Sequence, residues 1–175
     1  DEVKKVVDEA RKLVEDDKRT NEEVLRRTRE LLERDERKNE EAVKRIRDLL
    51  KEIKKLVEAG VDKRELKKRI DELLERLERL VRDSERLNEE ILKEDRKVVE
   101  ESEERNERIK DRLRKLPVDE ELLKRIDELI KESKRRTKEA HRESEELARK
   151  TKKSTRDLLR EVEKRLREIK EEIKR

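Results

Sequence analysis

The sequence predicts an all-α protein: a long, nearly straight, up-down-up antiparallel three-helix bundle that forms one domain over residues 1–175. Three observations support this prediction. Aliphatic residues follow one stripe of each long segment at helical spacing. The chain contains one glycine and one proline, so helix breakers stand at only two places. The pattern also repeats every 18 residues, about five turns of an α-helix, so residues 18 apart lie on one line of a straight helix.

The repeat is clearest in small polar residues that stand among the aliphatic ones. Asp17 and Asn21 recur as Asp35 and Asn39. The same step relates further pairs: Ser84 and Asn88 to Ser102 and Asn106, and Ser133 and Thr137 to Thr151 and Thr155. A repeat of 3.5 residues would impose a left-handed supercoil and one of 11 residues a right-handed supercoil, so this period predicts almost no supercoil.

The first predicted helix covers residues 2–59. Gly60 suits the left-handed position just after a helix end, with Val61 folding back on Leu56 as in a Schellman motif. The polar stretch at 16–21 resembles a loop, but the apolar spacing continues through it unshifted. We therefore expect one continuous helix in this part of the chain.

The second and third predicted helices cover residues 62–116 and 118–174. Asp62, followed three residues later by Glu65, is typical of an N-cap with a capping box. Pro117 cannot continue a helix, and Asp119 or a neighbour is expected to cap the next one, whose first turn is acidic. Because both connections are short, consecutive helices are expected to turn back and lie antiparallel.

This topology brings the polar residues into three layers. Residue x of the first helix faces roughly residue 120 minus x of the second and roughly residue x plus 117 of the third. One layer holds Asp17, Asn21, Ser102, Asn106, Ser133 and Thr137; a middle layer holds Thr28, Asp95, His141 and Ser144; another holds Asp35, Asn39, Ser84, Asn88, Thr151, Ser154 and Thr155. Successive layers are about nine residues, or roughly 13 Å, apart.

The residue types in these layers are those of buried hydrogen-bond networks. An amide side chain donates and accepts, a hydroxyl donates once and accepts twice, and a carboxylate only accepts. A buried polar group without a partner costs about 1–3 kcal/mol, so any slip of a helix is penalised. We interpret the layers as devices that specify helix register and pairing.

Charge and composition exclude several classes of function. The 56 basic and 52 acidic residues are interleaved and leave a net charge of +4, whereas a nucleic-acid interface needs clustered positive charge. The densest basic runs, 134–138 and 149–153, are short. The chain has no cysteine, which excludes disulfides and thiolate metal sites. No apolar run approaches the roughly 20 residues of a membrane span, and no targeting signal is recognised.

Two kinds of site chemistry, a hydrolytic triad and a metal site, lack support in the sequence. Asp95, His141 and Ser144 have the residue types of a hydrolytic triad, but nothing supplies an oxyanion hole, because amides inside a helix are already bonded. Metal sites in bundles use Glu-x-x-His, and Lys138 stands three residues before His141, the one histidine. The sequence therefore predicts no enzyme, no metal and no cofactor. A pH-sensitive role for His141 stays open, with a neutral histidine bonded to Asp95 as the expected state.

Taken together, these features resemble a family. The polar layers, the aliphatic-only core, the Glu/Lys/Arg surface and the loops at 58–62 and 116–121 resemble de novo designed helical bundles with buried hydrogen-bond networks. The resemblance covers the whole chain and implies a soluble, synthetic protein without a natural biochemical function or a predicted localisation. Some members of that family are plain scaffolds, whereas others are subunits that await a partner helix.

Two functional hypotheses follow from this reading. The first is a self-contained structural scaffold that requires no partner and binds neither nucleic acid nor a membrane. The alternative is an interaction module, in which an open apolar and polar groove binds a fourth helix or a second copy of the chain. The width of the apolar stripe fits both a closed three-helix core and one quarter of a four-helix core.

Overall fold

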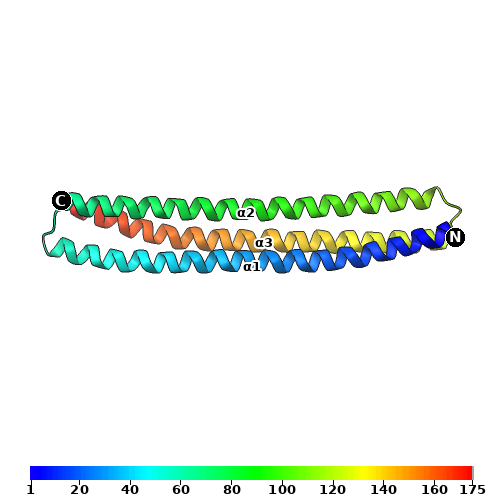
Figure 1. The fold of residues 1–175 in the computed structure, drawn as a ribbon, viewed down its shortest axis with the longest axis horizontal. Helices are drawn as coiled ribbons and strands as arrows, with labels where there is room; N and C mark the ends of the chain where they lie inside the picture. The colour runs from blue at the N-terminus through cyan, green and yellow to red at the C-terminus, as the bar shows by residue number, and fades with distance from the viewer. Residues whose placement is uncertain (175) are drawn as a thin grey trace. The chain divides into compact units, whose positions relative to one another are not determined.

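The computed structural model describes residues 1–174, and it consists of three helices: α1 (Glu2–Glu58), α2 (Lys63–Arg114) and α3 (Glu120–Lys174) (Figure 1). No strand occurs among these described residues. The predicted all-α, three-helix class is confirmed. α1 continues through residues 16–21 without a break, as the uninterrupted apolar spacing indicated.

The first connection has the hydrogen bonds of a Schellman motif. Gly60 adopts the left-handed conformation, with a φ of 75°. Its N–H donates to Val57 O at 3.2 Å, and the N–H of Val61 donates to Leu56 O at 3.1 Å. The Asp62 carboxylate then accepts from the backbone N–H of Arg64 at 3.1 Å, which satisfies a free donor at the start of α2.

The second connection shortens the two helices that flank it. α2 ends at Arg114 and α3 begins at Glu120, two residues inside the predicted limits at each side. A residue before proline is disfavoured in the helical region, and the proline ring clashes with the carbonyl four residues earlier. The chain instead makes a tight turn around Pro117, in which the N–H of Val118 donates to Leu116 O at 2.8 Å.

The described chain divides into two compact units, each of which contains a part of all three helices. Unit 1 comprises residues 1–30 and 90–147, and unit 2 comprises residues 31–89 and the chain from Ala148 onward. Every cross-helix contact described below lies inside one of these units.

Cross-helix contacts within the units establish the helix directions. In unit 1 the partners on α1 and α3 rise together, from Asp17–Ser133 to Asn21–Thr137 to Arg29–Glu143, and the α2 partner falls from Arg112 to Ser102 as the α1 residue rises from Glu9 to Asp17. In unit 2 the α3 partner falls from Lys170 to Arg156 as the α2 residue rises from Asp71 to Glu85, and the short turn at Gly60 reverses the chain between α1 and α2. In each unit α1 and α3 are therefore parallel, and α2 is antiparallel to both.

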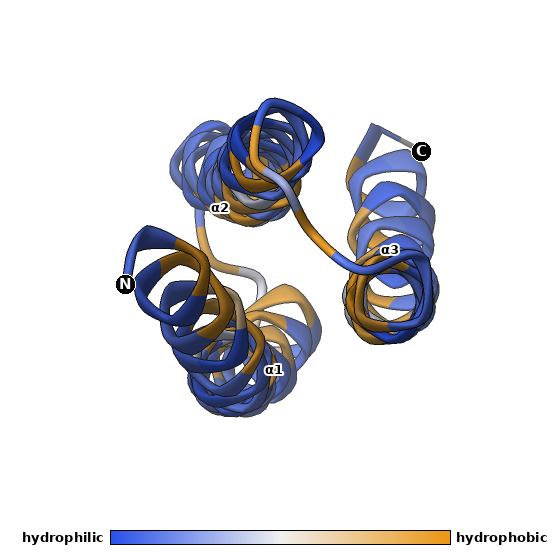
Figure 2. Cartoon of the chain, turned by 90° about the vertical axis from the view of Figure 1, so that its right-hand side faces the viewer, coloured by the Kyte–Doolittle hydropathy of each residue, from blue (hydrophilic) through white to orange (hydrophobic). Residues whose placement is uncertain are grey.

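Each unit has its own aliphatic core, and the apolar residues of the helices turn toward one another (Figure 2). Unit 2 is built around Ile46, Ile70 and Val162, and unit 1 around Val6 and Ile130, all of them fully buried. Leu49 and Leu129 stand at the edge of their apolar stripes and are more than a third exposed. These cores leave the polar layers as the candidate functional sites.

Candidate functional site

The structure buries most of the residues predicted to form polar layers. Twelve of them are less than a tenth exposed: Asp17, Thr28, Asn39, Ser84, Asn88, Asp95, Ser102, Asn106, Ser133, Thr137, Ser144 and Thr155. Asn21, Asp35, His141 and Thr151 are partly buried, and Ser154 is exposed. A buried polar side chain in a helix is usually hydrogen-bonded, either to another side chain or to a backbone carbonyl of its own helix.

Asp17 is the centre of the layer in unit 1. Its Oδ2 accepts from the Ser102 hydroxyl of α2 at 3.0 Å and from the Ser133 hydroxyl of α3 at 3.3 Å. Its Oδ1 accepts from the guanidinium of Arg105, also on α2, at 3.3 Å. One carboxylate on α1 is thus bonded to both other helices at the same level.

The same layer contains a second bond between α1 and α3. Asn21 Nδ2 donates to Thr137 Oγ1 at 2.9 Å, and the Thr137 hydroxyl donates to the backbone carbonyl of Ser133 at 2.9 Å. Asn106 of α2 is fully buried, yet neither its amide nitrogen nor its oxygen makes a hydrogen bond within the described chain. The sequence places Asn106 in this layer, but the bonds form without it.

The layer of unit 2 centres on Asp35. Asp35 Oδ2 accepts from the Ser84 hydroxyl at 2.5 Å, and Asn39 Nδ2 donates to Ser84 Oγ at 2.9 Å and to Asp35 Oδ2 at 3.4 Å. The predicted members Asn88 and Thr155 are buried, but Asn88 Oδ1 and the Thr155 hydroxyl make no hydrogen bond among the described residues. This network therefore links α1 to α2.

The two layers share one element and differ in the rest. In both, an α1 aspartate accepts from an α2 serine, in the pairs Asp17–Ser102 and Asp35–Ser84. The asparagine bonds α3 in unit 1 but α2 in unit 2. The 18-residue repeat thus reproduces the carboxylate–hydroxyl pair. It does not fix the partner of the asparagine side chain, which differs between the two layers.

The middle layer lies in unit 1 and surrounds the histidine. His141 Nδ1 lies 3.6 Å from Asp95 Oδ2, and its Nε2 lies 3.1 Å from Glu145 Oε1. Burial raises the pKa of Asp95 above its ordinary value of 3.8, and this is opposed by the neighbouring Ser144 hydroxyl and His141. Thr28 of α1 is buried at the position the sequence assigned to this layer.

The prediction that Ser154 lies in a buried layer is wrong, because its side chain is exposed. The residue 18 positions earlier on the same line of the helix is Arg136, which is also exposed, so this line faces solvent. The buried line of the helix passes instead through Thr137 and Thr155. A neighbour in the chain is rotated by about 100° on a helix and points elsewhere.

Sequence reasoning missed two charged partners of these layers. Arg105 reaches Asp17 although its own side chain is 46% exposed, because a long arginine can extend its head along a helix surface. Glu145 is four residues from His141, and this spacing alone would have predicted the contact. The reach of Arg105 has no comparable signal in the sequence.

The geometry does not match a hydrolytic triad. A triad requires a hydrogen bond between the serine and the histidine, whereas the buried Ser144 hydroxyl lies beside Asp95, whose pKa it lowers, and makes no hydrogen bond to His141. The outer nitrogen of His141 faces Glu145 instead. Within residues 1–174, no three histidine or acidic side chains converge on a point that could hold a metal ion.

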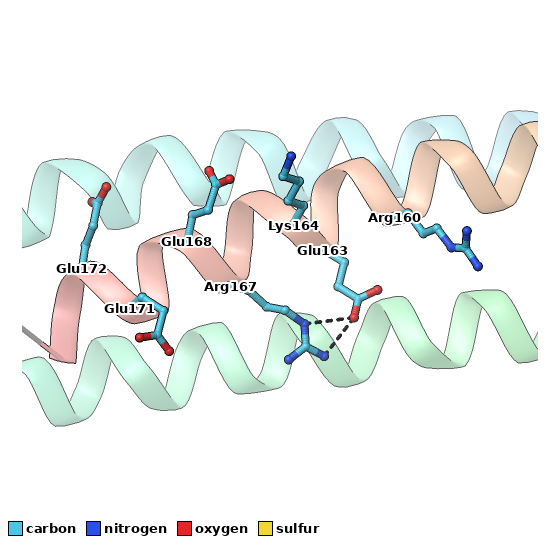
Figure 3. A pocket seen from close by; sticks show the side chains of 7 residues that line it. All are labelled: Arg160, Glu163, Lys164, Arg167, Glu168, Glu171 and Glu172. Atoms are coloured by element: carbon cyan, nitrogen blue, oxygen red, sulfur yellow. Dashed lines mark hydrogen bonds and ion pairs between the residues drawn. The ribbon is translucent and has the colours of Figure 1, made fainter.

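Surface charges are paired rather than gathered into a basic patch at 134–138. Lys134 bonds Glu107 at 3.0 Å, which lowers the pKa of that carboxyl, and Arg135 bonds Glu132 and Glu139. A depression along α3 is lined by seven charged residues, among which Arg167 donates to Glu163 (Figure 3).

Comparison with known proteins places the fold. No protein-family model matches the chain, and no curated protein matches it. No helix among the described residues is both long and apolar enough to cross a bilayer. Among solved structures, the chain is similar to one described as a computationally designed three helix bundle, with a TM-score of 0.66 and 21% sequence identity over 99% of this chain and 92% of the other. At this identity the similarity establishes the fold, which is a three-helix bundle.

Proposed function

We propose that this chain is a designed structural scaffold without biochemical activity, in which the buried polar layers specify helix register and pairing. The observation that carries the proposal is the repeated carboxylate–hydroxyl pair, Asp17–Ser102 and Asp35–Ser84, formed 18 residues apart in two units. A functional site needs one unique constellation, whereas a device for specifying register gains from repetition.

The Asp17 layer illustrates how register is specified. Its carboxylate accepts from Ser102 on α2 and from Ser133 on α3, so both helices must be in register with α1 at once. A shift of either helix by one turn moves its hydroxyl by about 5.4 Å, beyond hydrogen-bond distance. Each hydroxyl left without a partner then costs about 1–3 kcal/mol.

Composition and comparison support the synthetic origin. The chain has no aromatic residue, methionine or cysteine, and 62% of its residues are charged. Its fold is similar to that of a computationally designed bundle, and no protein family matches it. The lack of a hydrogen bond between Ser144 and His141, which a hydrolytic triad needs, supports a chain without enzymatic activity.

The test replaces the amides on one line of α1. We expect Asn21→Leu together with Asn39→Leu to raise thermal stability, because apolar burial replaces polar burial, and to reduce the uniqueness of assembly. Size-exclusion chromatography with light scattering and refractive-index detection measures the second effect against the monomer mass of 21.5 kDa. The proposal is wrong if the variant stays purely monomeric and becomes less stable.

A matched control separates the loss of polarity from the gain of volume. Val3 and Val57 lie on the same line of α1 as Asn21 and Asn39, in steps of 18 residues. Val3→Leu together with Val57→Leu enlarges two apolar side chains and removes no polar group. Its oligomeric state should equal that of the unmodified chain.

The alternative function, an interaction module for a fourth helix or a second copy, has less support. The unbonded amide of Asn106 could serve a partner, but this side chain is fully enclosed by the three helices of its own unit. A partner would reach it only after those helices separate. A dimer of the unmodified chain, or a monomer that binds a hydrophobic dye, would favour this alternative over the scaffold.

A further inference from the structure

The middle layer has an arrangement of donors and acceptors that the scaffold role does not require. His141 is placed between two carboxylates, with Asp95 Oδ2 3.6 Å from Nδ1 and Glu145 Oε1 3.1 Å from Nε2. A neutral imidazole carries one N–H and one lone pair, whereas an imidazolium carries two N–H groups. With every group deprotonated, one ring nitrogen therefore directs a lone pair at a carboxylate.

The burial of the cluster makes this mismatch costly. The Asp95 side chain is 4% exposed and that of His141 is 19% exposed. Neither Asp95 Oδ2 nor His141 Nδ1 makes a hydrogen bond within the described chain. One added proton, on the ring or on the carboxyl, makes one atom of the His141 Nδ1–Asp95 Oδ2 pair a donor and the other an acceptor. Because the two groups titrate together, this proton is assigned to the pair and not to either residue.

Among the described residues, the charged groups around the cluster do not supply a donor to either carboxylate that could replace the added proton. α2 contributes Asp95, α3 contributes Glu145 beside the histidine, and the layer member on α1 is the uncharged Thr28. At the same level the charged pair Arg29 of α1 and Glu143 of α3 joins at the exposed surface. The raised pKa of Asp95, caused mainly by burial, has the same sign: folding strengthens proton binding, so stability rises as the pH falls through the raised value.

From this geometry we propose that Asp95, His141 and Glu145 form a proton-binding cluster through which mild acidification stabilises the packing of unit 1. The step adds one proton from solvent and changes no other bond. Unit 1 thereby contains a pH-responsive layer at positions where the 18-residue repeat otherwise has leucine. By the 18-residue repeat, Asp95 corresponds to Leu77 and Leu113, and His141 corresponds to Leu159 and Leu123.

That correspondence supplies the matched variant. Asp95→Leu together with His141→Leu copies the apolar pair Leu77 and Leu159 into the layer and removes the cluster. Denaturant unfolding of the two proteins, followed by circular dichroism, gives folding constants from pH 8 to pH 5. Dividing the folding constant of the original chain by that of the variant at each pH removes the effect of the other carboxylates, which both proteins share. We expect the ratio of original chain to variant to rise about tenfold on acidification; a change below twofold, or a fall, overturns the proposal.

A second measurement remains informative if the leucine variant folds poorly. The chain has one histidine, so its imidazole signals in a nuclear magnetic resonance titration are unambiguous. In the folded protein, Asp95→Asn should change the pH dependence of these imidazole signals, because it removes the carboxylate that faces Nδ1, and Glu145→Gln should change it to a smaller extent. Imidazole signals whose pH dependence is the same in Asp95→Asn as in the original chain overturn the proposal, whatever the stability data show.

Discussion

The strongest test of the polar layers changes Asp17 and its partners, because the chain contains an apolar template for the same layer. Asp17, Ser102 and Ser133 each correspond to a buried residue 36 positions away: Ile53, Leu66 and Ile169. Those three residues belong to the aliphatic core of unit 2. Replacing the polar trio by its template therefore exchanges one kind of layer for the other.

The single change Asp17→Ala should destabilise the protein. It removes the acceptor of two buried hydroxyls, at about 1–3 kcal/mol for each group left unbonded. Two effects reduce this cost. Each hydroxyl can turn to a carbonyl of its own helix, as Thr137 does toward Ser133 at 2.9 Å, and Arg105, 46% exposed, can return to water. We expect a net loss of about 2–4 kcal/mol in the free energy of unfolding.

The triple change Asp17→Ile, Ser102→Leu and Ser133→Ile should have the opposite sign. The donor and the acceptor of each hydrogen bond are removed together, which by itself changes the free energy of unfolding little. Three buried aliphatic side chains then contribute about 1.5–3 kcal/mol each, reduced by about 1–3 kcal/mol for each site that becomes overpacked. With one overpacked site the net gain is about 1.5–8 kcal/mol, so we expect the triple variant to have a higher free energy of unfolding than the unmodified chain.

Denaturant unfolding followed by circular dichroism at 222 nm measures both effects, since the chain has no aromatic residue to follow by fluorescence. Asp16→Ala, at the exposed neighbouring position, is the control and should change stability by less than about 0.5 kcal/mol. The reasoning fails if Asp17→Ala costs no more than this control. It fails equally if the triple variant is less stable than the unmodified chain.

Three further predictions concern the connections and the cores. Gly60→Ala should cost about 1 kcal/mol in thermal unfolding from backbone strain alone, since an added Cβ meets nothing within 4 Å; a neutral result would mean that the left-handed turn is not required. Asp62→Ala should cost about 1 kcal/mol through the lost N-cap, and Asp62→Asn, which retains an acceptor, should restore most of it. Leu113 in unit 1 and Leu66 in unit 2 are each 1% exposed, and replacing either by alanine should lower the free energy of unfolding by about 2–5 kcal/mol. In a one-domain chain each replacement shifts a single thermal transition. Two separate transitions would contradict the one-domain prediction.

The sequence by itself determined the elements, their order and the face that each helix buries. The 3.6-residue period assigns every position to a side of its helix, so Asp17 and Asp35 could be placed on the buried side without coordinates. Gly60 and Pro117 end helices for local steric reasons, and their positions required no tertiary information. The shortened ends of α2 and α3 differ from the prediction by two residues at each side because only the turn around Pro117 decides where the last helical residue stands.

Only the tertiary structure decided which donor meets which acceptor. A helical period places a residue to about half a turn, whereas a hydrogen bond tolerates a few tenths of an ångström in distance. Asn21 therefore bonds α3 while Asn39 bonds α2, although both occupy the same line of α1. Asn106 lies in its expected layer without a hydrogen bond, and Arg105 reaches into that layer from outside. These outcomes depend on side-chain rotamers and on the packing of three helices at once, and no periodicity in one chain segment contains that information.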